Sequence, residues 1–184
     1  MRSNTRNRAV VGTLVGLGIL GGATGLTVAQ AAPAPQQAPQ PPQPPAAVIQ
    51  QPVLSVDAAT KAAQAALDAA EAKGQRVTVS IVDRAGNERV RLTGDGAGPQ
   101  SGESAKRKAF TAVAWGKPTA ELGKGITGDG PTLRDIPGTL FLGGGVPVTA
   151  GSPIAGIGVA GAPSADLDAE FANAGLQAIQ AELR

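Results

Sequence analysis

An uncharged tract rich in proline, glutamine and alanine, residues 33–52, limits where this chain can fold. Such a composition favours extended polyproline II conformers and offers too few apolar side chains to build a core. We interpret residues 32–53 as a disordered tether; a ligand for a proline-binding module has the same composition. The folded part is then residues 54–184, about 130 residues, the size of one domain.

The segment before the tether has the order of a secretory leader. Arg2, Arg6 and Arg8 precede an apolar, glycine-rich stretch over residues 9–28, and AQA at 29–31 fits a small-residue cleavage site. We interpret residues 1–31 as a signal peptide and expect a secreted, extracellular protein. A membrane anchor is the alternative, since the stretch is nearly long enough to span a bilayer.

Residue types that are absent or scarce exclude many kinds of site. The chain has no cysteine, histidine or tyrosine, and its only methionine is the initiator. Disulfides, imidazole or thiolate metal sites, Ser-His or Cys-His catalytic pairs and the usual haem ligands are therefore excluded. Without the leader, 13 basic residues stand against 14 acidic ones, which gives no electrostatic reason to expect nucleic-acid binding.

Hydrophobic periodicity predicts the order helix, strand, strand, helix, three strands, helix. Ser55 and Ser164 are placed to cap the first and last helices, Ser101 or Ser104 the middle one, and Thr119 a short turn. The helices are expected at 56–70, 103–115 and 165–183, and the strands at 77–82, 88–93, 139–142, 146–149 and 154–160. Tight hairpins favour an α+β fold with a largely antiparallel sheet covered by helices. Many apolar residues are small, so oligomerisation would usefully add buried surface.

Two glycine-rich motifs resemble nucleotide-binding sequences without meeting their requirements. The motif GIGVAG at 156–161 fits G-x-G-x-x-G, but the chain ends with the following helix and offers no second parallel strand. We interpret these glycines as allowing close packing against a strand or a neighbouring subunit. The motif GITGDGP at 125–131 lacks the Gly-Lys-Ser/Thr ending of a P-loop.

The middle helix carries the residues that most suggest a binding site. Lys106 and Lys108 flank Arg107 near its start, where cations oppose the helix dipole unless an anionic ligand or partner offsets the cost. Lys108, Thr111 and Trp115 share one face, which suggests a pocket wall. For the cationic run, the alternative is ordinary surface solvation. For the shared face, the alternative places Trp115 in the core and extends Lys108 to the surface.

Acidic residues cluster on the first and last predicted helices. Asp68 and Glu71 lie three residues apart and could hold a hard cation such as iron, or form a solvated helix face. Asp166, Asp168 and Glu170 occupy the first turns of the last helix, where acidic side chains favour the helix dipole.

A set of short motifs spans the whole folded part of the chain. They are VSIVD at 79–83 with Gly86, GDGA at 94–97, Ser101, SAKRKAFTA at 104–112, Thr119, FLGGGVP at 141–147, and GIGVAG at 156–161 with Asp168. In this order they resemble the GlcG/HbpS family, which includes the C-terminal domains of PduO-type proteins. The leader and the cysteine-free domain make the extracellular haem-binding members the most similar in character.

The resemblance implies a profilin-like fold, with a five-stranded antiparallel sheet flanked by helices, and assembly into an octamer. It also implies haem binding, oxidant-dependent haem degradation with iron release, and signalling through a membrane sensor histidine kinase. The absence of histidine departs from relatives that use an imidazole, so either Thr111 or Lys108 is the iron donor or no protein atom binds the iron. Lys106, Lys108 and Arg134 could pair with haem propionates, and Trp115 could line the pocket. We therefore expect modest, reversible haem binding.

Two other functions remain open on the sequence alone. One is a binding module or enzyme for a small organic anion, of the GlcG type. The other is an interaction protein without a ligand. Any enzymatic activity on the haem hypothesis is at most oxidant-dependent haem degradation, driven by the bound cofactor.

Overall fold

The computed structural model describes residues 47–127 and 132–183, so the predicted signal peptide and most of the predicted tether lie outside the described residues. The helices in this part are α1 (Val56–Glu71), α2 (Ser101–Trp115), α3 (Thr119–Lys124) and α4 (Ala165–Ile179), with short 3₁₀ helices η1 (Leu133–Asp135) and η2 (Gln180–Glu182). The strands are β1 (Thr78–Asp83), β2 (Glu88–Thr93), β3 (Gly145–Ala150) and β4 (Ser152–Ala160). Among the helices described here, none is both long and apolar enough to cross a membrane.

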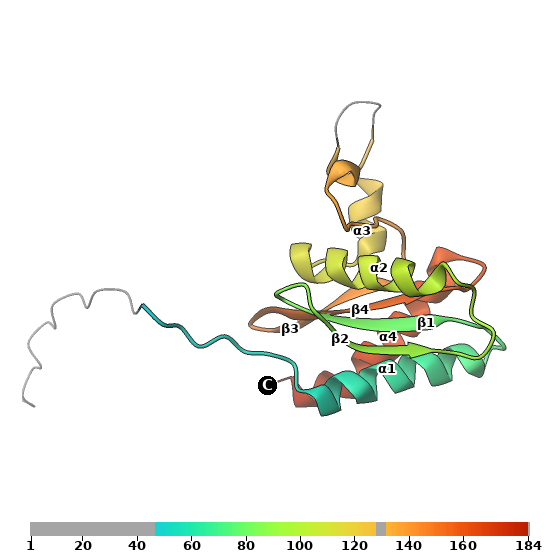
Figure 1. Cartoon of the computed structure of the whole chain (residues 1–184), viewed down its shortest axis with the longest axis horizontal. Coiled ribbons are helices and arrows are strands. Elements are labelled where there is room, and N and C mark those ends of the chain that lie inside the picture. Colours follow the sequence, from blue (N-terminus) through green and yellow to red (C-terminus); the bar gives the residue numbers. More distant parts are fainter. Residues whose placement is uncertain (1–46, 128–131, 184) are drawn as a thin grey trace, which may run out of the picture. The chain divides into compact units, whose positions relative to one another are not determined.

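The strands form one antiparallel sheet in the order β2-β1-β4-β3. Helices α1 and α4 pack together on one face of the sheet and α2 covers the other, as Figure 1 shows. Every residue of β1 is buried because this central strand has helices on both faces. The predicted α+β class, with an antiparallel sheet flanked by helices, is confirmed.

The five-strand count is not confirmed, since the sheet of the described residues has four strands. The predicted strand at 139–142 is irregular chain. Its backbone bonds to α2 instead: the Leu140 N–H donates to Thr111 Oγ1 at 2.8 Å, and the Thr139 carbonyl accepts from Arg107 at 2.5 Å. These side-chain bonds satisfy backbone groups that a sheet ladder would otherwise pair.

Strand β4 alternates large apolar residues with glycine. Ile157 and Val159 belong to the core shared with α1 and α4, whereas Gly156 and Gly158 face α2. A Cβ atom at Gly158 would lie 2.0 Å from the carbonyl oxygen of Ala105, so only glycine lets the helix backbone rest on the strand. Close packing at Gly156 and Gly158 is thus confirmed, but the partner is helix α2 and not the strand or neighbouring subunit that the motif suggested.

Local sequence signals set the ends of the outer helices. Ser55 accepts a hydrogen bond from the Ala58 N–H at 3.2 Å and caps α1, and Gly74 follows that helix with a φ of 65°. Ser164 caps α4 by accepting from the Leu167 N–H at 3.2 Å. These caps are the ones that the sequence predicts.

Tertiary contacts replace two other predicted caps. Helix α2 begins at Ser101 with Gln100 in the N-cap position and without a side-chain cap. The buried Ser101 hydroxyl lies instead 2.7 Å from Thr78 Oγ1 in β1. Thr119 Oγ1 accepts from the Gly145 N–H at 2.9 Å rather than capping α3. Both hydroxyls hold a helix against the sheet.

The turn between β1 and β2 is organised by Asp83. One oxygen of its carboxylate accepts hydrogen bonds from the N–H groups of Ala85 and Asn87, each at 2.9 Å. Burial acts to raise the pKa of Asp83, but hydrogen bonds from Asn87 and Ala85 and the charge of Arg89 together lower that pKa below its ordinary value. Ionised Asp83 therefore stabilises the turn.

Candidate functional site

A cavity of about 280 Å³ lies between α2 and the segment that leads from η1 to β3. Its size is near the lower end of ligand pockets, which hold roughly 300–1,000 Å³. It combines apolar side chains with cationic ones. The residues that line it are Arg107, Arg134, Thr139, Leu140, Phe141 and Leu142.

Arg107 enters the cavity from α2 and is only partly satisfied there. Its Nη2 donates to the Thr139 carbonyl at 2.5 Å. Its Nε is buried and has no hydrogen-bond partner, the one such case among the buried side-chain nitrogen and oxygen atoms of the described residues. Buried polar groups are nearly always paired, so an unpaired one calls for an explanation.

Thr111 fixes the wall of the cavity from behind. Its buried hydroxyl donates to the Arg107 carbonyl at 2.8 Å, one turn earlier in α2, and accepts from the Leu140 N–H at 2.8 Å. The hydroxyl thereby sets the position of Leu140 relative to α2. Thr111 lies outside the set of lining residues.

An aromatic pair belongs to the same wall of the cavity. The rings of Trp115 and Phe141 meet edge to face, with centroids 5.4 Å apart and an angle of 72° between their planes. Phe141 is buried and lines the cavity, while Trp115 is half-buried beside it. The indole therefore lies next to the site and can report on a ligand in it.

The segment around η1 brings a second arginine to the cavity. Thr132 and Asp135 form a reciprocal capping box that orders η1. Arg134, within η1, is exposed, and its Nη2 is 3.4 Å from the Ile126 carbonyl. Among the residues that the structure describes, the cavity lining thus holds cations at Arg107 and Arg134 and no acidic side chain.

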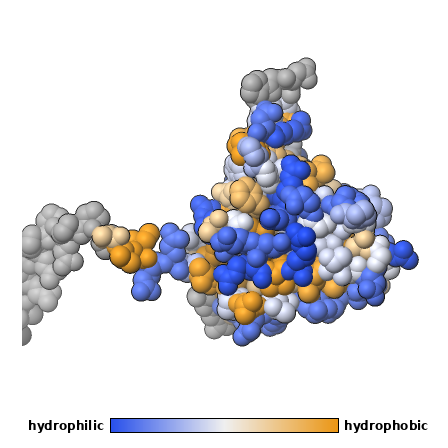
Figure 2. All heavy atoms as spheres, viewed as in Figure 1, coloured by the Kyte–Doolittle hydropathy of each residue, from blue (hydrophilic) through white to orange (hydrophobic). Residues whose placement is uncertain are grey.

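Apolar side chains are exposed around this cavity. Leu133 is 40% exposed, Ile136 41% and Leu142 56%. Figure 2 shows hydrophobic residues interspersed with hydrophilic ones on the projection that carries α3 and η1. Exposed apolar side chains that gather in this way are typical of interaction sites.

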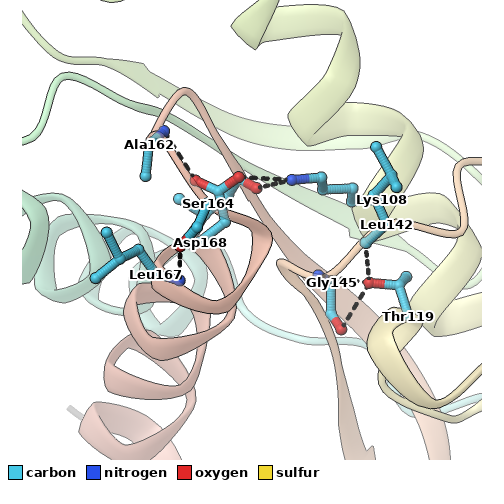
Figure 3. Close-up of polar contacts among 9 residues, drawn as sticks. Lys108, Thr119, Leu142, Gly145, Ala162, Ser164, Leu167 and Asp168 are labelled. Atoms are coloured by element: carbon cyan, nitrogen blue, oxygen red, sulfur yellow. Dashed lines mark hydrogen bonds and ion pairs between the residues drawn. The ribbon is translucent and has the colours of Figure 1, made fainter. Parts of the chain in front are cut away.

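A buried ion pair joins α2 to α4 beside the glycines that precede β3 (Figure 3). Lys108 Nζ donates to Asp168 Oδ2 at 2.7 Å and to the Val159 carbonyl at 3.0 Å. Asp168 Oδ1 accepts from the Ala162 N–H at 3.1 Å. The side chains of the pair are only 4% and 6% exposed. This pair connects helices on opposite faces of the sheet.

Gly144 closes tightly over the pair and explains part of the GGG segment. A Cβ atom at Gly144 would lie 2.7 Å from Asp168 Cβ and 2.9 Å from Lys108 Nζ, and its φ is 115°. Burial raises the pKa of the Asp168 carboxyl, although the hydrogen bond and charge of Lys108 and the Ala162 N–H act in the opposite direction.

The structure brings together some of the predicted haem-contacting residues and separates others. Arg134 lines the cavity, and Trp115 supports its wall. Thr111 and Lys108 are buried with their polar atoms already bonded, so the surface alternative for Lys108 is wrong. Lys106 is half-buried and lies outside the lining set. Whether each of them contacts a ligand stays a prediction.

The predicted iron site on α1 also stays a prediction. Asp68 and Glu71 are both exposed, and Asp68 Oδ1 accepts from Gln64 Nε2 at 2.7 Å. Across the part of the chain that the structure describes, no three acidic, histidine or cysteine side chains are grouped so as to hold a metal ion.

The sequence patterns did not identify two residues with important contacts, one in the cavity and one in the buried ion pair. Arg107 lies in the predicted cationic run, and its spacing of four from Thr111 and eight from Trp115 is the signal that could have placed it on the same stripe. Asp168 was assigned only to the helix dipole. Its spacing of three from Phe171 and seven from Gly175 places it on the buried face of α4, where a carboxylate needs a partner.

Comparison with known proteins identifies the family. The family model described as "Haem degrading protein HbpS-like" matches residues 54–177, whereas no curated protein matches the chain. The crystal structure of HbpS is 62% identical, covers 71% of this chain and 93% of that chain, and has a TM-score of 0.69. The PduOC:heme complex is 32% identical, with 69% and 95% covered and a TM-score of 0.62. Klebsiella pneumoniae protein ORFY is 26% identical, with 76% and 99% covered and a TM-score of 0.68. The chain belongs to the HbpS-like family.

Proposed function

We propose that this chain is a secreted, oligomeric haem-binding protein that holds the porphyrin at the cavity between α2 and residues 139–142. The observation that carries the proposal is the cavity's composition: apolar walls, two arginines and, in the part of the chain that the structure describes, no acidic lining residue. This combination fits a flat apolar ligand that ends in carboxylates. A relative 32% identical to this chain was crystallised as a heme complex, which supports the same ligand class.

The side chains at the site are better suited to binding the porphyrin carboxylates than to ligating the iron. Histidine, cysteine and tyrosine are absent from the chain. The candidate donors, Thr111 and Lys108, are held by Leu140 and Asp168, so either would have to give up a hydrogen bond to reach iron. We therefore propose modest, reversible binding suited to sensing. When bound, haem would supply the redox chemistry for its own oxidant-dependent breakdown and for iron release.

The wider role is part of the same proposal. Export follows from the leader-like residues 1–31, and assembly, as an octamer on the family resemblance, would cover the exposed Leu133, Ile136 and Leu142. The oligomer would report haem or redox stress to a membrane sensor histidine kinase. Iron released from haem could bind Asp68 and Glu71 on α1.

A second function is favoured by the size of the cavity. At about 280 Å³ it would enclose a small organic acid more completely than a porphyrin. Such a ligand would use the same two arginines, so the alternative is a small-organic-anion module of the GlcG type.

Haemin titration distinguishes the two functions. Haemin is added to the chain from residue 32 onward, while Soret absorbance and Trp115 emission are followed and small acids are titrated in parallel. Haem binding predicts a saturable Soret change with quenching of the indole, and co-elution from a desalting column. Quenching by a small acid alone would support the second function, and a tight six-coordinate, nitrogen-ligated spectrum would contradict weak axial ligation.

A further inference from the structure

Arg107 has a polar atom for which the fold provides no partner. Its Nε is buried without a hydrogen bond, while Nη2 is fixed on the Thr139 carbonyl at 2.5 Å. A buried donor of a charged group that lacks an acceptor destabilises the folded state. A ligand acceptor that bonds to this Nε would remove that cost, so binding would be favoured beyond the contact itself.

The surroundings of Arg107 favour an anionic, amphiphilic ligand. Leu140, Phe141 and Leu142 supply apolar walls, and Arg134 supplies a second cation at the exposed side. The neighbouring cation Lys108 is already paired with Asp168 at 2.7 Å and leaves no charge for the cavity. The positive charge of the lining therefore comes from the two arginines.

We propose that Arg107 recognises a carboxylate of the bound ligand and makes the cavity select acidic porphyrins over their neutral esters. This inference rests on the proposed haem function and specifies how the same site chooses its ligand. The planar guanidinium suits the task because it offers several N–H donors in fixed geometry, and carboxylates bind such a fork through charge-assisted hydrogen bonds. Arg134 adds a second contact that is weaker because it is exposed to solvent.

A purely structural role for Arg107 makes a different prediction. In that case the side chain only secures Thr139, and removing its charge would weaken binding of acidic and esterified porphyrins alike. The preference for acidic over esterified porphyrins therefore distinguishes carboxylate recognition by Arg107 from a purely structural role.

The test uses metal-free protoporphyrin IX and its dimethyl ester, with Trp115 quenching in the full exported chain as the readout. The wild type is expected to bind the diacid at least tenfold more tightly than the diester. Arg107→Met is expected to weaken diacid binding about 10- to 100-fold and to leave diester binding within about twofold. Arg76→Met, at an exposed arginine outside the cavity, is the matched control and should change neither.

Arg107→Lys keeps the charge without the fork and should give an intermediate loss for the diacid. If Arg107→Met does not fold, this variant and the wild-type preference carry the test. Equal binding of diacid and diester by the wild type overturns the inference, as does an equal loss of both ligands in Arg107→Met, or no binding of either. Haemin that binds to Arg107→Met as it does to the wild type overturns the inference and leaves the haem function standing. If the protein prefers the diacid but does not bind haemin, the inference about Arg107 stands and the haem function is overturned.

Discussion

Replacing Asp168 with asparagine leaves the Lys108 amine buried without a charged partner, and we expect the folded state to lose about 3–5 kcal/mol. The pair lies almost wholly out of solvent, with side chains 4% and 6% exposed, so water cannot easily replace the lost carboxylate. Lys108→Met should cost a similar amount, because it leaves Asp168 with the Ala162 N–H as its remaining partner in the described contacts.

The magnitude follows from opposing terms. At the observed Nζ–Oδ2 distance of 2.7 Å, an effective dielectric constant near 20 gives an attraction of about 6 kcal/mol. Removing the two ions from water costs several kcal/mol each, so the pair is close to neutral overall. The raised pKa of Asp168 has the same cause, since burial outweighs its partners. Lys108→Met combined with Asp168→Leu should therefore be near wild type or more stable.

Urea unfolding followed by Trp115 fluorescence at fixed protein concentration measures these free energies. Lys61→Met is the matched control, because its pair with Glu182 is about half exposed and should contribute less than about 1 kcal/mol. The reasoning is refuted if Asp168→Asn costs no more than this control. It is also refuted if the double variant is as unstable as the two single losses added together.

Three further predictions concern the sheet, the turn and the cavity wall. Gly158→Ala should destabilise the fold by about 3 kcal/mol or more, because α2 must move off β4, while Gly125→Ala should be nearly neutral; thermal melting of both checks this. Asp83 has a lowered pKa in the fold, so its stabilisation exists above the unfolded value near 3.9 and is lost as the pH falls through the folded pKa. Urea titrations at different pH should show that Asp83→Asn reduces the loss of unfolding free energy at acid pH. An unchanged loss in the variant would contradict the assignment. Thr111→Val should cost about 1–3 kcal/mol by leaving the Leu140 N–H without its acceptor, and a smaller loss would show that the loop re-pairs.

Local sequence signals predicted most of the secondary structure because they act over a few residues. Ser55 and Ser164 cap their helices, and the change from helical to alternating apolar spacing after Gly74 marks the first strand. Residues 139–142 have a strand-like composition too. Their backbone bonds to Thr111 and Arg107 on α2, and such long-range partners leave no local pattern in the sequence.

The candidate site was less predictable for the same physical reason. Lys108 and Asp168 are 60 residues apart, and each alone resembles a solvated helix residue. Thr119 has the sequence signature of a cap, yet its hydroxyl bonds to Gly145. The cationic run at residues 106–108 indicated an anionic ligand or partner as one of two interpretations, beside ordinary surface solvation. Which of its cations remains unneutralised depends on the placement of α4, which the sequence pattern does not determine.

Locating the iron in crystals soaked with haemin tests most directly whether this cavity holds the porphyrin. We predict an anomalous iron signal beside Phe141 and Leu142, with porphyrin carboxylates within hydrogen-bonding distance of Arg107 or Arg134. Iron found on another surface of the domain, or a haemin-saturated crystal without iron beside the cavity, would contradict the proposed site.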